Sequence, residues 1–393
     1  MNRILFVDDE PKVLEGLQRM LYPLRSEWEM EFVCSGHQAL QRLSETEFDV
    51  LVTDIRMPVM TGIELLSEVI ERYPQVIRLV LSGTVDQELT LRSAAVAHQY
   101  MVKPCDANTL RAKVERAFSL RLILEDPALR RLVSSIHALP SPSGTYVKLL
   151  EAVRSSQATV RDIAAIVEQD PGMTAKVLQL VNSAFMGKSR QVNTPGEAVA
   201  ILGIDALRSL ALGASVFSQF DPTGLAGFTA EALQEHSLRV GTLAREIAQS
   251  MALPQAVVDE AFVGGLLHDS GKLVLAQNCA ESYREALLRA QRESIPVRDA
   301  ERAVFGTTHA EVGGYLLWLW GLPDPITEVE VLHHRLPPGR QHTPGAVLAV
   351  HIADALVNRR PDEDLDWERL WGAPWMTSLP QWQARTAEFP TRP

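Results

Sequence analysis

The chain has 393 residues, enough for two or three domains, and its 46% hydrophobic and 22% charged residues are typical of a soluble protein. The net charge of −11 is spread evenly, with 14 Lys and Arg against 19 Asp and Glu in residues 1–125 and 24 against 30 in the remainder. This leaves no basic stripe for DNA or RNA, and no apolar run is long enough for insertion into a membrane. The three cysteines lack CxxC spacing, which favours a cytoplasmic location.

Residues 1–122 alternate between short apolar runs and amphipathic segments, which is typical of an α/β doubly wound five-stranded parallel sheet. We expect strands at Ile4–Val7, Met30–Val33, Val50–Val52, Ile77–Leu81 and Tyr100–Val102. We expect helices at Pro11–Leu21, His37–Leu43, Gly62–Arg72, Asp86–Ala95 and Asp106–Leu124. The last helix is predicted to continue past Leu120 as a stiff lever into the next domain.

Polar side chains stand where four of these strands end. Asp8 and Asp9 follow the first strand, Asp54 the third, Ser82 the fourth and Lys103 the fifth. The carboxyl ends of parallel strands share one edge of the sheet, where carboxylates repel one another unless a divalent cation such as Mg²⁺ joins them. Asp54 alone is better explained as a turn former, but in this group it could act as a nucleophile toward phosphorus while Lys103 neutralises the phosphoryl charge.

The motifs ILFVDD, FDVLVTDIRMP, LVLSGT and YMVKP occur in an order that resembles the receiver domain of two-component response regulators. The resemblance covers residues 1–122 and implies that Asp54 is phosphorylated by a sensor histidine kinase. It also implies a Mg²⁺ site, switch or phosphate-contacting residues, and a cis peptide before Pro104. The implied Mg²⁺ ligands are Asp8, Asp9, Asp54 and the backbone carbonyl of Arg56; the implied switch residues are Ser82, Tyr100 and Lys103. The resemblance further implies a homodimer that pairs through the face containing Asp86–Leu124.

From Tyr146 onward the strand-like runs give way to helical periodicity, so we expect an all-α region. The Pro- and Ser-rich segment Leu139–Gly144 marks its beginning. We therefore expect a receiver (1–122), a helical connector (123–138), a helical domain (139–360) and a Trp- and Pro-rich tail of unknown role (361–393). The helices are expected at Tyr146–Ser155, Val160–Glu168, Pro171–Asn182, Pro195–Leu202, Ile204–Val216, Ala230–Met251, Gln255–Leu267, Ala280–Glu293, Val297–Phe305, His309–Trp320, Pro323–His333 and Ala346–Arg359.

Histidines and aspartates of the helical region form a candidate metal site. Its members are His236, His268, Asp269, His309, His333, His334 and Asp354. Imidazole nitrogen together with carboxylate oxygen suits Fe, Mn, Ni or Zn, and two such ions could activate hydroxide for phosphodiester hydrolysis with Lys272 contacting the phosphate. Simpler explanations stay open: Asp269 as a helix cap, Lys272 as a solvated charge, and His333-His334 as favourable charges at a helix end.

LLHDSGKL, THAEVGGYLL and HIADAL resemble the HD superfamily of metal-dependent phosphohydrolases. DPGMTAKVLQLVNSA and TPGEAVAILGIDALRSLAL are similar to the related HDOD domain, a signalling output, over residues 139–355. The chain departs from the cyclic-di-nucleotide phosphodiesterase branch because it lacks Gly-Tyr-Pro. Arg335 also replaces a Glu after His334, and Ala232 replaces an acidic ligand four residues before His236.

Two functions remain open at this point. The first is a non-enzymatic response regulator, in which phosphorylation of Asp54 switches an HDOD output that acts through a downstream protein partner. The second is a phosphorylation-gated metal-dependent phosphohydrolase, or a nucleotide receptor without turnover. The departures from the phosphodiesterase branch favour the first hypothesis.

Overall fold

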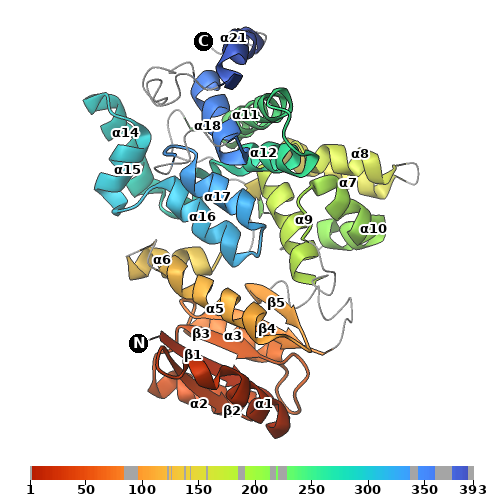
Figure 1. The fold of residues 1–393 in the computed structure, drawn as a ribbon, viewed down its shortest axis with the longest axis vertical. Coiled ribbons are helices and arrows are strands. Elements are labelled where there is room, and N and C mark those ends of the chain that lie inside the picture. The colour runs from red at the N-terminus through yellow and green to blue at the C-terminus, as the bar shows by residue number, and fades with distance from the viewer. Residues whose placement is uncertain are drawn as a thin grey trace. The chain divides into compact units, whose positions relative to one another are not determined.

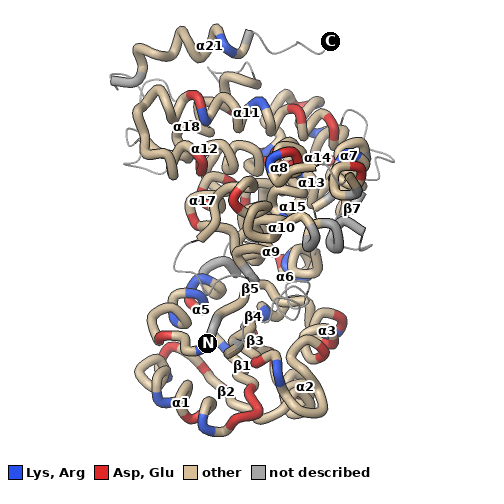
Figure 2. Tube along the Cα trace, turned by 90° about the vertical axis from the view of Figure 1, so that its right-hand side faces the viewer, with Lys and Arg blue, Asp and Glu red and all other residues tan. Residues whose placement is uncertain are grey.

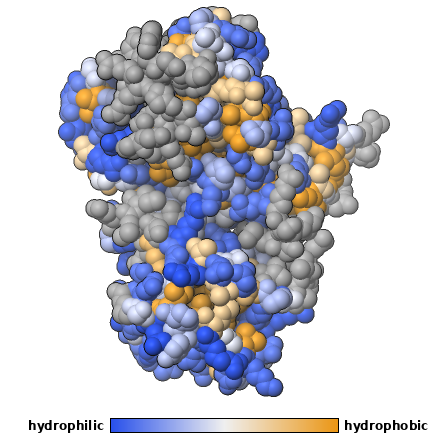
Figure 3. All heavy atoms as spheres, viewed as in Figure 1, coloured by the Kyte–Doolittle hydropathy of each residue, from blue (hydrophilic) through white to orange (hydrophobic). Residues whose placement is uncertain are grey.

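The computed structural model describes the chain except for residues 1, 84–95, 122–123, 125, 137–138, 142, 156–157, 185–190, 213–217, 220–227, 337–343, 359–373 and 388–393. The chain divides into two compact units (Figure 1). The first contains Met1–His137 with Gln179–Gln191 and Leu319–Gly321, and the second contains the other residues. On the face drawn in Figure 3, hydrophilic side chains alternate with smaller apolar patches.

The first unit contains the predicted five-stranded parallel sheet, in the order β2-β1-β3-β4-β5. Its strands are β1 (Asn2–Val7), β2 (Trp28–Val33), β3 (Val50–Thr53), β4 (Ile77–Ser82) and β5 (Gln99–Val102). Its helices are α1 (Pro11–Leu21), the 3-10 turn η1 (Tyr22–Leu24), α2 (Gly36–Glu45), α3 (Gly62–Arg72) and α5 (Ala107–Arg121). The helix predicted at Asp86–Ala95 lies outside the described residues.

The central strands of this sheet are apolar on both faces. Ile4, Leu5 and Phe6 of β1 are completely buried, and all four residues of β3 are buried. Such strands need helices on both sides of the sheet, and Figure 2 shows α1 and α5 on one side with α2 and α3 on the other. The start of α3 is fixed by a capping box, in which Thr61 and Glu64 exchange hydrogen bonds from each backbone N–H to the other side chain.

The prediction of one continuous helix leading out of the receiver is wrong, because two separate helices occupy this segment. Helix α5 ends at Arg121, and α6 (Pro127–Ser134) starts anew after Asp126, whose carboxylate accepts a hydrogen bond from the Ala128 N–H at 2.8 Å. Pro127 at the first helical position favours such a new start. The end of α6 is tied to the sheet by the buried Arg78, whose guanidinium donates to the Ser134 carbonyl at 3.0 Å.

Within its described residues the second unit is helical, as predicted, apart from a two-residue parallel pair between β6 (Pro140–Ser141) and β7 (Ser218–Gln219). Two predicted helices form the single element α10, which a non-helical residue, Gly203, interrupts at φ +76°. Helix α13 was not predicted. The helices are α7 (Ser143–Arg154), α8 (Val160–Val167), α9 (Pro171–Ala184), α10 (Pro195–Leu212), α11 (Ala230–Ser250), α12 (Gln255–Leu267), α13 (Ser270–Asn278), α14 (Ala280–Glu293), α15 (Val297–Phe305), α16 (His309–Leu319), α17 (Asp324–Leu332) and α18 (Ala346–Val357).

Helices α11, α12 and α18 form an apolar core that includes Leu243, Ile247 and Ile352. The described part of the tail, η2 (Pro374–Ser378) and α21 (Leu379–Ala387), packs on this core. Trp382 of α21 is 3% exposed, and its indole N–H donates to the Ser250 hydroxyl at 3.1 Å. Throughout the described residues, every helix is too short or too polar to span a membrane.

Candidate functional sites

The first candidate site lies at the carboxyl edge of the parallel sheet. Asp8 and Asp54, only 3% and 7% exposed, both contact the Lys103 ammonium, whose Nζ is 2.5 Å from Asp8 Oδ2 and 2.7 Å from Asp54 Oδ1. Burial opposes the charge on Lys103, but its hydrogen bonds to the two carboxylates raise its pKa above the usual lysine value. The structure therefore brings together three residues that the strand ends predicted.

The other predicted receiver residues surround this group or lie outside what is described. The Arg56 backbone N–H donates to Asp54 Oδ2 at 2.6 Å, and Asp9 is half-buried beside Asp8. Tyr100 is buried in the sheet, whereas the side chain of Ser82 is outside the described residues. The Lys103–Pro104 peptide is cis, as the resemblance implied. Three carboxylates against one ammonium form an oxygen-rich, negatively charged group that fits Mg²⁺, with Asp8, Asp9 and Asp54 as its predicted ligands.

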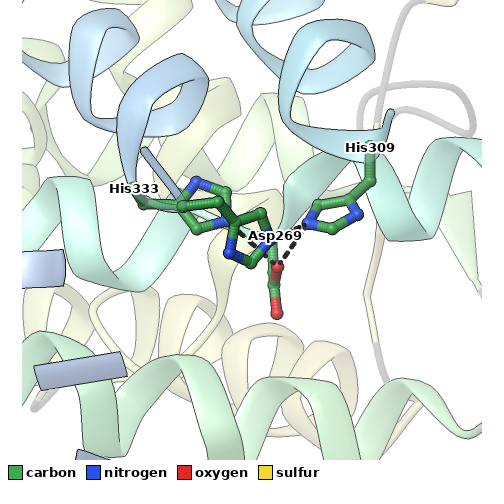
Figure 4. Close-up of side chains that lie close together, drawn as sticks. Asp269, His309 and His333 are labelled. Atoms are coloured by element: carbon green, nitrogen blue, oxygen red, sulfur yellow. Dashed lines mark hydrogen bonds and ion pairs between the residues drawn. The ribbon is translucent and has the colours of Figure 1, made fainter. Parts of the chain in front are cut away.

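The second candidate site lies inside the helical unit, around Asp269 at the start of α13 (Figure 4). Asp269 Oδ1 is 3.3 Å from His309 Nε2 and 3.8 Å from His333 Nε2. His334 Nε2 is 2.9 Å from His309 Nε2. These four residues form the first ligand group, contributed by the first residue of α16, the two residues that follow α17 and the residue before α13.

The other oxygen of Asp269 belongs to a second ligand group. Asp269 Oδ2 is 3.3 Å from His268 Nε2 and 3.5 Å from His236 Nε2. Asp354 of α18 completes this group, with Oδ1 at 3.2 Å from His236 Nε2 and 3.5 Å from His268 Nε2. All seven predicted residues thus converge, and Asp269 offers one oxygen to each group.

The tautomers of three histidines are fixed from outside the cluster. Each donates its Nδ1–H to an oxygen and points Nε2 toward the centre, which is the orientation of a metal-ligating imidazole. The acceptors are the carbonyl of Gly265 for His268 (2.7 Å), the carbonyl of Glu330 for His333 (2.7 Å) and the carboxylate of Glu301 for His309 (2.6 Å).

Two atoms at the centre of the cluster have no hydrogen-bond partner. His333 Nε2 and Asp269 Oδ1 are both buried, and a buried polar atom without a partner is costly. A divalent metal would satisfy both atoms, and the mixed nitrogen and oxygen donors suit Fe, Mn, Ni or Zn. The residues present therefore fit one ion in each ligand group, with Asp269 between them.

Charge in the cluster also favours a cation. Burial lowers the pKa of His268, but the carboxylates of Asp269 and Asp354 raise it well above the usual histidine value. Burial likewise opposes protonation of His309, yet the neighbouring Glu301 raises its pKa to about 9. Protons on these imidazoles supply the positive charge that the buried carboxylates require, and metal binding would displace them.

His333 and His334 behave in the opposite way. Burial lowers the pKa of both imidazoles well below the ordinary value, and positive charge on the neighbouring His309 lowers each further. Both rings are therefore neutral near pH 7, which is the form that binds metals.

The simpler explanation of Asp269 as a helix cap does not hold, because its side chain makes no capping hydrogen bond. Lys272, one turn into α13, places Nζ 2.7 Å from Asp269 Oδ2 and is therefore part of the cluster rather than a solvated charge. The close packing of α13 depends on Gly271, where a Cβ atom would lie 1.9 Å from the His309 carbonyl oxygen.

Sequence reasoning missed two buried glutamates that support this site. Glu301 binds both the backbone N–H and Nδ1 of His309. Glu330 accepts from the Ser270 hydroxyl at 3.0 Å, and burial raises its pKa to about 8. The only available signal was the position of Glu330 three residues before His333, on the same face of a helix.

Comparison with known proteins identifies both units. The receiver domain model of response regulators matches residues 4–115, and the HDOD domain model matches residues 139–336. The solved structure of the MmoQ response regulator from Methylococcus capsulatus is 28% identical with a TM-score of 0.50, covering 64% of this chain and 98% of that one.

Curated relatives share parts of the chain. An uncharacterized protein of Treponema pallidum is 25% identical over 244 residues, 61% of this chain and 46% of that protein. The hydrogenase transcriptional regulatory protein HoxA of Cupriavidus necator is 31% identical over 178 residues, 42% of this chain and 36% of HoxA. The chain thus spans less than half the length of these relatives.

A receiver followed by an HDOD domain is the architecture of a response regulator with an HDOD output domain. The HDOD model alone matches half of the residues of this chain, so the chain belongs to the HDOD domain family.

Proposed function

We propose that phosphorylation of Asp54 by a sensor histidine kinase switches the HDOD output domain of this response regulator. The observation that carries the proposal is the Asp8–Lys103–Asp54 group, where a nearly buried carboxylate is paired with an ammonium at the sheet edge. Lys103 would shift from the Asp54 carboxylate to the phosphoryl oxygens, with Ser82 and Tyr100 responding as in other receivers. Differential contacts in the two states typically provide about 1–3 kcal/mol of coupling.

The test treats the full chain with acetyl phosphate and Mg²⁺ and follows its oligomeric state by light scattering. We expect a phosphorylation-dependent change in the wild type and none in Asp54→Asn. Asp49→Asn serves as the matched control, because an amide keeps the oxygen that accepts from the Arg3 N–H. An unchanged response in Asp54→Asn would refute the assignment of Asp54.

A second candidate function is phosphoester hydrolysis by the output domain. It is favoured by the two ligand groups that share Asp269 and by the two buried atoms without hydrogen-bond partners. When bound, first-row divalent ions supply Lewis acidity toward phosphoryl oxygens and activate water. The chain itself contributes an oriented set of imidazoles, a shared carboxylate, and the Lys272 ammonium, 22% exposed, to attract phosphate charge.

Elemental analysis and a turnover assay separate the two output mechanisms. Stoichiometric metal that is lost in His268→Ala but kept in His37→Ala, an exposed histidine of α2, supports the metal site. Release of mononucleotides from cyclic di-nucleotides by the metal-loaded protein supports hydrolysis. If the protein stays free of metal after incubation with Mn²⁺, Fe²⁺, Ni²⁺ or Zn²⁺, the hydrolase is refuted. The result would support an output domain that acts through a protein partner.

A further inference from the structure

An open pocket of about 730 Å³ lies beside the histidine–aspartate centre, between α15, α16, α17 and the residues that follow α17. Its volume falls within the range of small-molecule binding sites, about 300–1,000 Å³. The polar lining includes Arg298, Arg302, Thr308, His334 and Arg335. Among the described residues, all that line this pocket belong to the helical unit.

His334 connects the pocket to the centre. Its imidazole lines the pocket, while its Nε2 atom lies 2.9 Å from His309 Nε2 in the first ligand group. A molecule in the pocket that contacts His334 is therefore next to the group formed by Asp269, His309, His333 and His334. The pocket leads to the place where the second candidate function requires a substrate.

Three guanidinium groups give the pocket an excess of positive charge. Arg302 is held in place by Glu311 at 2.9 Å, and the same carboxylate also accepts from the Thr308 N–H at 3.0 Å and the Thr307 hydroxyl at 2.7 Å. Glu311 is thus neutralised by its own partners, and Asp299 is the one other acid in the lining.

Arg335 has a different environment. It is exposed, and the structure gives it no ion pair within the described part of the chain. Because a guanidinium fork matches the geometry of phosphate oxygens, Arg335 beside His334 is suited to hold a phosphate group at the entrance to the metal centre.

The remaining lining residues are aliphatic: Ala310, Val331, Leu332 and Leu336. We propose that this pocket binds a phosphorylated ligand of nucleotide size, with its phosphate between Arg335 and His334 and its organic body along the aliphatic wall. The inference names the ligand class of the centre whose second candidate function is phosphoester hydrolysis, and in that sense it rests on that candidate function. Ligand binding itself does not require turnover.

The probe is guanosine 5′-monophosphate, titrated calorimetrically into the full chain at fixed salt, with guanosine and inorganic phosphate as comparison ligands. We expect guanosine monophosphate to bind about tenfold or more tightly than either comparison ligand, because only it engages both the arginines and the wall. Guanosine binding as tightly as the monophosphate would overturn the proposal.

Variants locate the binding. Arg335→Ala is expected to weaken guanosine monophosphate binding about tenfold, and Arg335→Lys to recover part of the loss, since an ammonium keeps the charge without the fork. Arg292→Ala, at an exposed arginine of α14 outside the pocket, should bind like the wild type. Equal affinity of Arg335→Ala and the wild type would place the ligand elsewhere and refute the proposal.

Metal content separates this proposal from the hydrolase assignment. Arg335 is not a member of either ligand group, so Arg335→Ala should retain the wild-type metal content while losing nucleotide affinity. Nucleotide binding by a protein that takes up no metal would support the pocket and refute the hydrolase. Metal uptake without nucleotide binding would support the metal centre and refute the pocket.

Discussion

Each unit of the protein contains an aspartate paired with a lysine at the same distance. Lys103 Nζ is 2.7 Å from Asp54 Oδ1 in the receiver, and Lys272 Nζ is 2.7 Å from Asp269 Oδ2 in the helical unit. In both pairs, burial opposes the ammonium while the carboxylate raises the lysine pKa. What differs is the set of residues around each pair.

Around Asp54 the neighbours are the Asp8 carboxylate and the Arg56 backbone N–H, whereas around Asp269 they are imidazoles that point Nε2 toward its oxygens. Asp54 keeps some exposure at 7%, but Asp269 is 1% exposed and shared between two groups of histidines. The same kind of ion pair therefore belongs to the proposed phosphoryl acceptor in one setting and to a proposed metal ligand in the other. The neighbours determine the chemistry.

The sharpest test of this difference compares the two amides. Asp54→Asn should abolish the phosphoryl adduct completely, because an amide is no nucleophile, while Asp269→Asn should leave it unchanged. Intact-protein mass spectrometry after acetyl phosphate treatment measures both. A residual adduct in Asp54→Asn would break the comparison by moving the acceptor elsewhere.

Metal stoichiometry gives the next largest effect. Asp269→Ala should lose the ions of both ligand groups, whereas His236→Ala and His334→Ala should each lose about one ion per chain, because each belongs to one group. Elemental analysis after desalting provides the counts, with His37→Ala as the control. If Asp269→Ala holds as much metal as His236→Ala, the carboxylate is not shared.

A third lysine extends the comparison, because its pKa is lowered where those of Lys103 and Lys272 are raised. Lys176 of α9 is 4% exposed, and burial lowers its pKa to about 8. In the unfolded chain the pKa of a lysine is about 10.4. Between about pH 8 and pH 10.4 the unfolded state therefore binds more protons than the folded state, so the free energy of unfolding rises with pH across this range. Lys176→Met should stabilise the protein by about 3 kcal/mol at pH 7 and by almost nothing at about pH 10.5.

Urea unfolding at the two pH values measures the effect of Lys176→Met. Lys148→Met, in a lysine that lies on the exposed side of α7, is the control and should show no such dependence on pH. A gain in stability that is equal at both pH values would mean that packing, and not the buried charge, is its source.

The smallest expected effect concerns the glutamates that support the centre. Glu301→Gln should weaken metal binding about tenfold, since the charge that orients His309 and raises its basicity is lost. Glu330→Gln should change it far less, because Glu330, with a pKa of about 8, is already mostly neutral at pH 7. Competition with a chelator measures both, and equal losses would argue against a special role for Glu301.

The receiver site was predictable because strand order brings residues to one edge without any knowledge of side-chain packing. Asp8, Asp54 and Lys103 each follow a strand, and parallel pairing then places them together. The hydrogen bond from the Arg56 N–H to Asp54 Oδ2 could not be predicted from the sequence, because it depends on the conformation of the turn after β3.

The helical site was predictable only as a set of residues. Its members run from His236 to Asp354, and nothing in that spacing tells which oxygen of Asp269 meets which imidazole. Helix α13 was missed because it is buried on nearly every side and lacks a polar stripe. Glu301 escaped notice for a related reason: its contact with His309 joins two helices, and no local pattern marks it.

Helix α18 has a practical consequence for work on the output domain alone. It lies beyond residue 336, where the match to the HDOD model ends, yet it supplies Asp354 and the apolar residues Leu348 and Ile352. A fragment limited to residues 139–336 would lack α18 and therefore one of the helices that form its apolar core. If that fragment failed to fold or to take up metal, the cause would be the missing helix α18, and the result would say nothing about the metal chemistry of the full chain.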